Sequence, residues 1–299
     1  MNSNMNQGVS RRSFMRILGA VSAAAGAFPA FAAMQQAGTQ ASSSSMGQRR
    51  MRGMQALPPD AVIISANENP LGPAQSALTA LCSTASMGGR YHYDEYMKTI
   101  GVFNEQFGLK SGYSALYPGS TTPLDLALMS NIGPDKPLVY GDPSYEQGPR
   151  AAETMKATKY AVPLTATYAH DVKAMLRAHP SPGAYYIVNP NNPTGTMTPK
   201  ADLVWLVNNK PKGSVVIIDE AYHHFSDDES CIDLVAQDKD VIIMRTFSKI
   251  YGMAGLRAGF AIARPDLLER LNTVGGSNGQ GMGSVSITTA AAARAKHSS

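Results

Sequence analysis

The chain has 299 residues, 43% of them hydrophobic, so it is long enough to bury a large core in one or two domains. Its formal net charge of +4 comes from the N-terminal part, where six arginines and no acidic residue precede Asp60. The slightly acidic remainder argues against a nucleic-acid-binding protein. Two cysteines, Cys82 and Cys231, make neither a disulfide framework nor a metal site, and whether they pair cannot be read from the sequence.

Residues 1–33 are expected to form a signal segment. The stretch SRRSFMR at 10–16 resembles the twin-arginine export motif of bacteria, and an alanine-rich run follows it, with a possible cleavage site at 30–32. This resemblance implies export by the twin-arginine translocation machinery to the periplasm. An N-terminal amphipathic helix or an uncleaved anchor are the alternatives, although two glycines and a proline weaken a membrane-spanning helix. Residues 34–56, rich in Gln, Ser, Met and Arg, are expected to be a disordered linker.

From Leu57 onwards the composition is typical of a globular domain. Residues 67–73 read as a turn-rich loop, 74–81 as a short helix, and 90–94 as an aromatic loop before another helix. The small residues at 117–122 then lead into a helix expected over 123–130. Free N–H groups at the start of a helix can bind a phosphate, although an ordinary helix cap explains the same residues.

Later strands are expected at 138–140, 184–188, 215–218 and 241–244, with a helix at 200–209 among them. Strands that alternate with helices predict an α/β fold: a three-layer sandwich around a mostly parallel sheet. Ligands of such sheets collect at the carboxyl ends of the strands. Polar side chains that follow strands are therefore predicted to converge on one site, and they are Tyr145, Asn192, Asp219, Tyr222 and Lys249.

Lys249 lies in a Gly-rich turn after the last of these strands. Thr246 and Ser248 stand beside it in the sequence, and Arg257 follows eight residues later. A lysine at the end of a strand usually just extends into the solvent and has no further role. With hydroxyls and a guanidinium nearby, however, it suits a lysine that holds a phosphate-bearing cofactor as a Schiff base.

Seven stretches, in family order, resemble the fold-type-I pyridoxal-phosphate aminotransferases of class I/II, and most of all the histidinol-phosphate aminotransferases. They are NENPLGP at 67–73, RY at 90–91, GSTT at 119–122, DPSY at 142–145, NPNNPTG at 189–195, DEAY at 219–222 and RTFSKIYGMAGLRAG at 245–259. The resemblance implies a homodimeric biosynthetic enzyme with pyridoxal 5'-phosphate as cofactor. Such an enzyme moves an amino group between an amino acid, or an amino-alcohol phosphate, and a 2-oxo acid.

The resemblance also implies roles for single residues. Lys249 matches the Schiff-base lysine, and Asp219 matches the carboxylate under the pyridinium nitrogen. Asn192 and Tyr222 match the donors to the phenolic oxygen, and Tyr145 matches the ring that stacks on the cofactor. Lys249, Asp219 and Tyr222 are the expected catalytic residues.

The remaining roles concern the phosphate, the partner subunit and the substrate. Phosphate binding falls to Ser120, Thr121, Thr246, Ser248 and Arg257. Tyr91 matches a tyrosine that reaches the cofactor phosphate of the neighbouring subunit, although His92-Tyr93-Asp94 stand where the family has Pro-Asp. Asn67 lies in the segment that lines the substrate cleft.

Residues 57–299 are thus expected to be the large cofactor-binding domain, incomplete at its C-terminus. The family continues into a small domain whose arginine pairs with the substrate α-carboxylate, and no arginine here stands in a matching motif. A fragment, a truncated gene product or a different way of holding the substrate are the explanations, and the 299-residue chain alone is expected to bind the cofactor but transaminate poorly. Two other functions stay open: another reaction of the same cofactor (a decarboxylase or a C–S/β-eliminating lyase), or a non-catalytic cofactor-binding protein. The amino donor and acceptor stay undetermined.

Overall fold

Five consecutive apolar residues, Ala184–Val188, form strand β4, which is buried at every position. Only a central strand covered on both faces has this pattern. A computed structural model describes residues 60–275 and 284–297, and the unit considered below begins at Ile64. The predicted signal segment at 1–33 and the linker at 34–56 lie outside the described residues.

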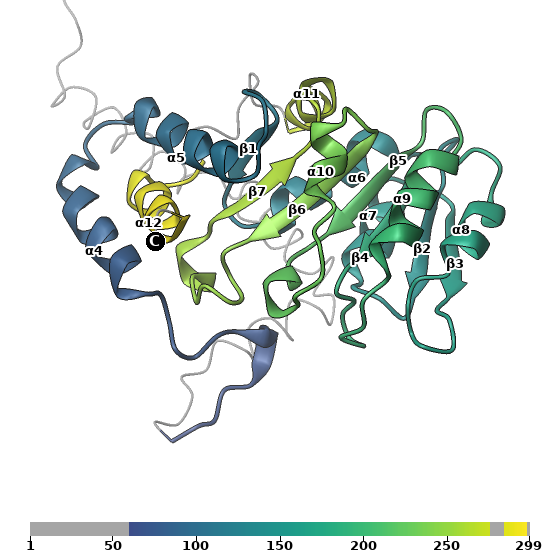
Figure 1. Cartoon of the computed structure of the whole chain (residues 1–299), viewed down its shortest axis with the longest axis horizontal. Coiled ribbons are helices and arrows are strands. Elements are labelled where there is room, and N and C mark those ends of the chain that lie inside the picture. The colour runs from purple at the N-terminus through teal and green to yellow at the C-terminus, as the bar shows by residue number, and fades with distance from the viewer. Residues whose placement is uncertain (1–59, 276–283, 298–299) are drawn as a thin grey trace, which may run out of the picture. The chain divides into compact units, whose positions relative to one another are not determined.

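β4 is an interior strand, next to the middle strand β5, of a seven-stranded sheet with the order β1-β7-β6-β5-β4-β2-β3 (Figure 1). The neighbours β6–β5, β5–β4, β4–β2 and β2–β3 pair in parallel, whereas β7 pairs antiparallel with both β6 and β1. Within this sheet only β7 runs against the other strands. The strands are β1 Ser114–Tyr117, β2 Leu138–Asp142, β3 Lys159–Pro163, β4 Ala184–Val188, β5 Val215–Asp219, β6 Val241–Thr246 and β7 Gly259–Ile262.

Helices cover both faces of the sheet. One core cluster joins the sheet to α4, α5, α8, α9, α10 and α12, and the other joins it to α6, α7 and α11. The predicted three-layer α/β sandwich is therefore confirmed. The helices are α4 Gln75–Thr84, α5 Tyr93–Gln106, α6 Thr121–Asn131, α7 Gln147–Thr154, α8 Val172–Ala178, α9 Lys200–Asn209, α10 Ile232–Ala236, α11 Pro265–Val274 and α12 Ile287–His297, with short 3-10 turns η2 Ser65–Asn67, η3 Ala85–Met87, η4 His223–Phe225 and η5 Ala254–Leu256.

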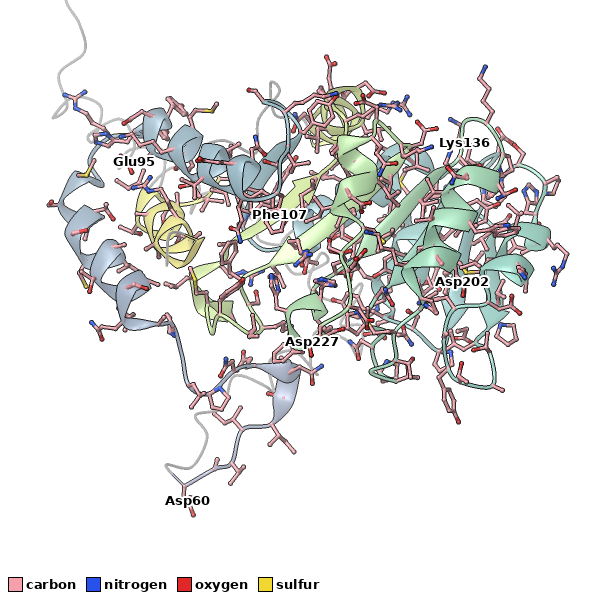
Figure 2. All side chains as sticks on the ribbon, in the orientation of Figure 1. Asp60, Glu95, Phe107, Lys136, Asp202 and Asp227 are labelled. Carbon is pink, nitrogen blue, oxygen red and sulfur yellow. The ribbon has the colours of Figure 1, made fainter. Side chains whose placement is uncertain are left out.

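The C-terminal helix α12 packs against α4 and α5 (Figures 1 and 2). Its Arg294 lies 2.7 Å from the carboxylate of Glu95, a residue of α5 that is only 7% exposed. Thr99 of α5 also donates to the Ala290 carbonyl at 3.0 Å. Within the described residues no helix is both long and apolar enough to cross a membrane.

Three strands that the sequence did not predict, β1, β3 and β7, complete the sheet. β3 is largely exposed at the edge, so its residues lack the apolar run that reveals β4. β7 follows a Gly-rich turn and begins with Gly259, where an added Cβ would lie 2.6 Å from the backbone of Gly119. The predicted strands at 215–218 and 241–244 both continue further, to Asp219 and Thr246.

Candidate active site

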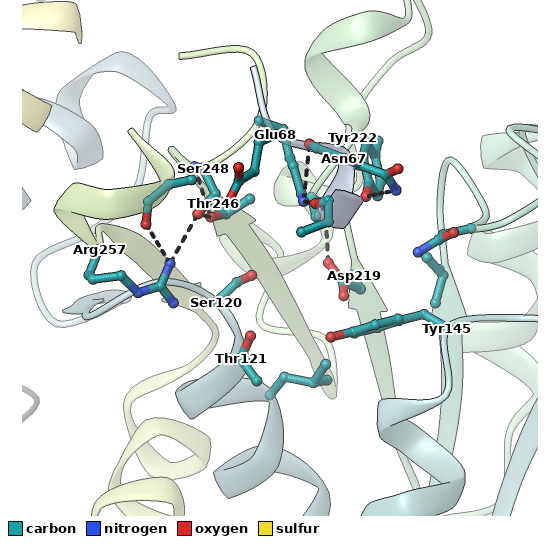
Figure 3. A pocket seen from close by; sticks show the side chains of 17 residues that line it. Asn67, Glu68, Ser120, Thr121, Tyr145, Asp219, Tyr222, Thr246, Ser248 and Arg257 are labelled. Carbon is teal, nitrogen blue, oxygen red and sulfur yellow. Dashed lines mark hydrogen bonds between the residues drawn. The ribbon is translucent and has the colours of Figure 1, made fainter. Parts of the chain in front are cut away.

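A cavity of about 380 Å³ opens at the carboxyl edge of the parallel strands (Figure 3). This volume lies within the range of small-molecule sites. Its lining residues come from the ends of strands, from the loops after them and from the segment before α4. They are Ala66, Asn67, Glu68, Ser120, Thr121, Leu124, Tyr145, Val188, Asn192, Asp219, Ala221, Tyr222, Thr246, Ser248, Lys249, Ala254 and Arg257.

Arg257 occupies one end of the cavity, where the chain bends sharply. Its guanidinium donates to the carbonyls of Ala254 at 2.9 Å and Pro118 at 3.3 Å, and it lies 3.4 Å from the Ser248 hydroxyl. Gly119 makes this approach possible, because a Cβ there would lie 2.4 Å from the guanidinium and its φ of +84° favours glycine. The backbone therefore fixes the direction of the one arginine that lines this cavity.

Hydroxyl groups surround Arg257. Thr246 donates to Ser248 at 2.9 Å and accepts from the Ser248 amide at 3.1 Å, so the two side chains hold each other in place. Ser120 is the N-cap residue of α6, and its hydroxyl makes no capping bond within that helix. With Thr121 in the first turn, this end of the cavity offers a guanidinium, hydroxyls and the start of a helix, a combination that binds phosphate.

Asp219, the last residue of β5, is 3% exposed and accepts a hydrogen bond from the Ala221 amide at 3.0 Å. Burial raises the pKa of this carboxyl to about 6, and the negative charge of Glu220 adds to the rise, while the positive charge of Lys249 opposes it. A buried carboxylate is costly unless a cation faces it. Asp219 thus suits a ligand that brings a positively charged or proton-bearing nitrogen.

Lys249 lines the cavity beside the segment that precedes α4. Its amine donates to the carbonyls of Ala66 at 2.7 Å and Asn67 at 3.3 Å, and it stands 5.4 Å from the centre of the Tyr222 ring. The Tyr222 hydroxyl in turn accepts from the Asn67 side chain at 2.9 Å. Ala66 and Asn67 both have a positive φ, 59° and 51°, which turns their carbonyls toward the lysine.

The structure brings all but one of the predicted site residues into this cavity. Tyr91 is the exception: its side chain is 68% exposed, and it stacks on Tyr93 at 5.7 Å between ring centroids. The cavity also contains Glu68, which the sequence pattern did not single out although it lies within the stretch 67–73. In the described residues both cysteines are free, and no cluster of side chains could hold a metal ion.

The sequence pattern of aminotransferase class I and II matches residues 58–298. The chain belongs to the class I and II aminotransferases. Histidinol-phosphate aminotransferase 1 of Cupriavidus pinatubonensis is 35% identical over 217 residues, which cover 71% of this chain and 57% of that protein. An aromatic amino acid aminotransferase of Cutibacterium acnes is 33% identical over 219 residues, covering 72% of this chain and 62% of the relative.

A solved structure of this family is similar in fold and carries the cofactor. Histidinol-phosphate aminotransferase from Sinorhizobium meliloti, in complex with pyridoxal-5'-phosphate, matches with a TM-score of 0.65 at 25% identity, covering 78% of this chain and 63% of that one. This class I and II aminotransferase chain spans about six tenths of the length of the relatives named here.

Proposed function

We propose that this protein is a pyridoxal-phosphate-dependent aminotransferase. One observation carries the proposal: a buried carboxylate, Asp219, shares a cavity with the Lys249 amine and with a phosphate-binding group around Arg257. These are the three anchors that pyridoxal phosphate needs, at its ring nitrogen, its aldehyde and its phosphate. The family pattern and the cofactor in the S. meliloti structure support the same conclusion.

The residues present fit this cofactor. Arg257 and the hydroxyls of Ser120, Thr121, Thr246 and Ser248 would hold its phosphate. Tyr145 would stack on its ring, and Asn192 and Tyr222 would donate to its phenolic oxygen. Once bound, pyridoxal phosphate supplies an electron sink for the electron pair left on the substrate α-carbon.

Asp219 and Lys249 would carry the chemistry of this chain. A negatively charged Asp219 keeps a proton on the ring nitrogen, and this pairing removes the cost of burying the charge. The Lys249 amine would bind the cofactor aldehyde and, once released, move a proton at the substrate α-carbon. Asn67 lies at the mouth of the cavity, bonded to Tyr222, where it would line the substrate cleft.

The proposed substrates are a 2-oxo acid acceptor and an amino donor of the kind that the relatives' names indicate, histidinol phosphate or an aromatic amino acid. The test is a half-reaction: the full chain with pyridoxal phosphate receives each donor, and the pyridoxamine form of the cofactor and the carbonyl product are measured. Release of carbon dioxide or ammonia instead would assign a decarboxylase or an eliminating lyase. A cofactor that binds without any turnover would make the chain a non-catalytic binding protein.

We also propose that the enzyme is a homodimer in which Tyr91 serves the partner's site. Tyr91, just before α5, and Tyr93 and Met97, within its first turns, are 68%, 52% and 50% exposed. A second copy would cover this apolar surface. Mixing Lys249→Ala chains with Tyr91→Ala chains tests this. A mixed dimer holds one intact site, so activity should return on mixing, whereas two chains acting independently would stay inactive.

Export by the twin-arginine machinery to the periplasm is a further proposal, supported by the arginine pair at 11–12 and the alanine-rich run after it. Replacing both arginines by lysine should hold a tagged protein in the cytoplasm. Equal amounts of the two forms in the periplasm would contradict it.

A further inference from the structure

A buried ion pair lies behind the candidate active site and does not line the cavity. Glu220 and Arg245 are 1% and 4% exposed, and Oε2 of the glutamate lies 2.8 Å from Nη2 of the arginine. Each follows or precedes a cavity residue in the chain: Glu220 comes after Asp219, and Arg245 comes before Thr246. Because side chains alternate along a strand, the pair faces the opposite side of the sheet.

Two further hydrogen bonds hold the Glu220 carboxylate. Its two carboxylate oxygens accept from the Ser230 hydroxyl at 2.8 Å and from the Cys231 amide at 2.9 Å. Its own amide donates to the Met244 carbonyl at 3.0 Å, which continues the pairing of β5 with β6 beyond Asp219. The glutamate is therefore held as a charged group in one orientation.

Arg245 extends the contact toward both catalytic loops. Its Nη1 lies 3.0 Å from Nε2 of His224, and the His224 ring meets the Tyr251 ring edge-on at 4.9 Å between centroids. His224 stands two residues after Tyr222, and Tyr251 stands two residues after Lys249. The loop after β5 and the loop after β6 are thus joined on the side away from the cavity.

We call Glu220, Arg245, His224 and Tyr251 the rear network. We propose that the rear network is a positioning unit, which joins the loop of Tyr222 to the loop of Lys249 and neutralises the charge of Glu220 beside Asp219. The inference rests on the proposed function, since it assigns these residues to the same cofactor site.

The neutralising role follows from the position of the charges. Glu220 is adjacent to Asp219 in the chain, so its negative charge raises the pKa of Asp219 and works against the anion that the cofactor requires. Arg245, 2.8 Å from Glu220, offsets that effect. The other titratable groups near Asp219 are Tyr145, Tyr186 and Lys249. Those near the Glu220–Arg245 pair, besides His224, are His223, Cys231 and Tyr251.

The test compares three variants: Arg245→Met, Glu220→Gln and the double variant with both changes. The measured quantity is the dissociation constant of pyridoxal phosphate from the full chain, titrated at a series of pH values. Arg245→Met leaves an uncompensated negative charge beside Asp219. The pH at which binding is half lost in acid should therefore rise by about one unit. Glu220→Gln leaves an uncompensated positive charge, so this pH midpoint should fall. The double variant should return toward the wild-type midpoint.

Opposite shifts are the signature of charge compensation, because damage to packing alone would weaken binding in the same direction in every variant. Removing one partner of a buried ion pair destabilises a protein, whereas the double variant avoids the unpaired charge and keeps the test possible if Arg245→Met does not fold. Glu153→Gln, which removes an exposed carboxylate paired with Lys159, is the matched control and should leave the profile unchanged.

Two results would overturn the inference: shifts in the same direction for both single variants, or unshifted profiles in variants that still bind the cofactor. Absence of pyridoxal-phosphate binding by the wild-type chain is a different outcome, which would overturn the proposed function itself. The loop-joining role has its own readout, because Tyr251→Leu, which keeps all charges, should lower kcat while the binding profile keeps its pH midpoint.

Discussion

The Lys249 amine donates a hydrogen bond of 2.7 Å to the backbone carbonyl of Ala66, 183 positions earlier in the chain. The segment before α4 therefore holds the amine that is proposed to bind the cofactor. Asn69 strengthens the attachment, since its side chain donates to the Ile250 carbonyl at 2.9 Å. The lysine must leave these carbonyls before it can react with an aldehyde.

Lys249 should be the one point of covalent attachment. After reconstitution with pyridoxal phosphate, borohydride should fix the cofactor to a single peptide that contains Lys249. Lys249→Ala should abolish turnover while some cofactor still binds through its phosphate. Peptide mapping by mass spectrometry and a turnover assay measure the two effects. Lys212→Ala, an exposed lysine outside the cavity lining, is the control, and label on any other lysine would contradict the assignment.

Asn67 should contribute separately through its side chain and its backbone. Both Asn67→Ala and Asn67→Gly remove the hydrogen bond to Tyr222, so both should raise KM for the amino donor by a similar factor. The alanine variant should also lose about 1 kcal/mol of stability relative to the glycine variant, because the φ of 51° is unfavourable for alanine. Steady-state kinetics and thermal unfolding measure the two effects. Equal stability of the variants would show that the segment adopts a different backbone in solution.

Asp219→Asn should have opposite effects on stability and on catalysis. The folded-state pKa of about 6 lies above the ordinary value of 3.8, so the charged form destabilises the cofactor-free protein at neutral pH. The amide should raise the stability of that form at pH 7 by up to about 3 kcal/mol. It should also lower kcat/KM by several powers of ten, since the ring nitrogen loses its proton.

The control is Asp135→Asn, which changes an exposed aspartate and should alter neither the stability at pH 7 nor kcat/KM. Unfolding in urea and steady-state kinetics provide the measurements. An Asp219→Asn enzyme with nearly full activity would mean that another carboxylate faces the cofactor; Glu220 is turned away and paired with Arg245, which leaves Glu68 as the other carboxylate in the cavity lining.

The pH dependence of stability should change shape in the same variant. His170 is 2% exposed, and burial lowers its pKa from 6.5 to about 4. The unfolded chain therefore binds this proton first, and stability is lost as the pH falls from about 6.5 to about 4. Asp219 contributes the opposite slope between pH 4 and 6, because its pKa is raised rather than lowered. Urea midpoints of cofactor-free Asp219→Asn should thus fall more steeply with acid than those of the wild type, and parallel curves would contradict the raised pKa of Asp219.

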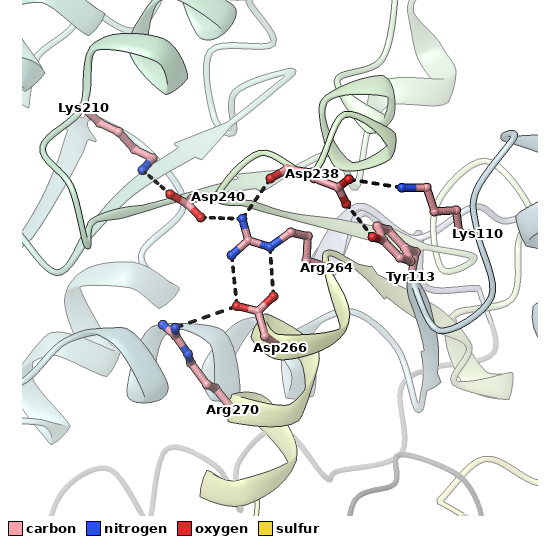
Figure 4. Close-up of polar contacts among 8 residues, drawn as sticks. All are labelled: Lys110, Tyr113, Lys210, Asp238, Asp240, Arg264, Asp266 and Arg270. Atoms are coloured by element: carbon pink, nitrogen blue, oxygen red, sulfur yellow. Dashed lines mark hydrogen bonds and ion pairs between the residues drawn. The ribbon is translucent and has the colours of Figure 1, made fainter.

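A charge network at the opposite edge of the sheet should contribute to stability alone (Figure 4). Arg264 binds Asp266 through two bonds of 2.9 and 3.0 Å, and it donates to Asp240 at 2.8 Å. Arg264→Met should cost about 1–2 kcal/mol in urea unfolding and leave cofactor binding unchanged. Arg150→Met breaks an exposed pair with Glu146 and should cost less than about 1 kcal/mol. Equal costs for the two variants would mean that the network adds nothing to an isolated surface pair.

Local sequence patterns were sufficient to predict the centre of the fold. The apolar runs at 184–188 and 241–244 can be stable only when both faces of the strand are covered, which implies a parallel sheet between helices. The alternation of strands with helices then places the carboxyl ends of the parallel strands at one edge. For this reason the sequence pattern alone assigns Tyr145, Asp219 and Lys249 to one site, and all three line the same cavity.

Contacts between distant segments could be decided only by the tertiary structure. The bond from Lys249 to Ala66, the pairing of Glu220 with Arg245 and the place of Glu68 in the cavity lining depend on backbone turns and side-chain directions that no short stretch encodes. Strands β1, β3 and β7 were missed for local reasons: β1 and β7 are only four residues long, and β3 is largely exposed at the edge. The pairing of β1 with β7, which lies much later in the chain, could be seen only in the tertiary structure. Local periodicity is set by which face of an element is buried, and so the sequence determined which residues reach the catalytic edge. The partner that each residue meets there is set by the packing of the whole chain.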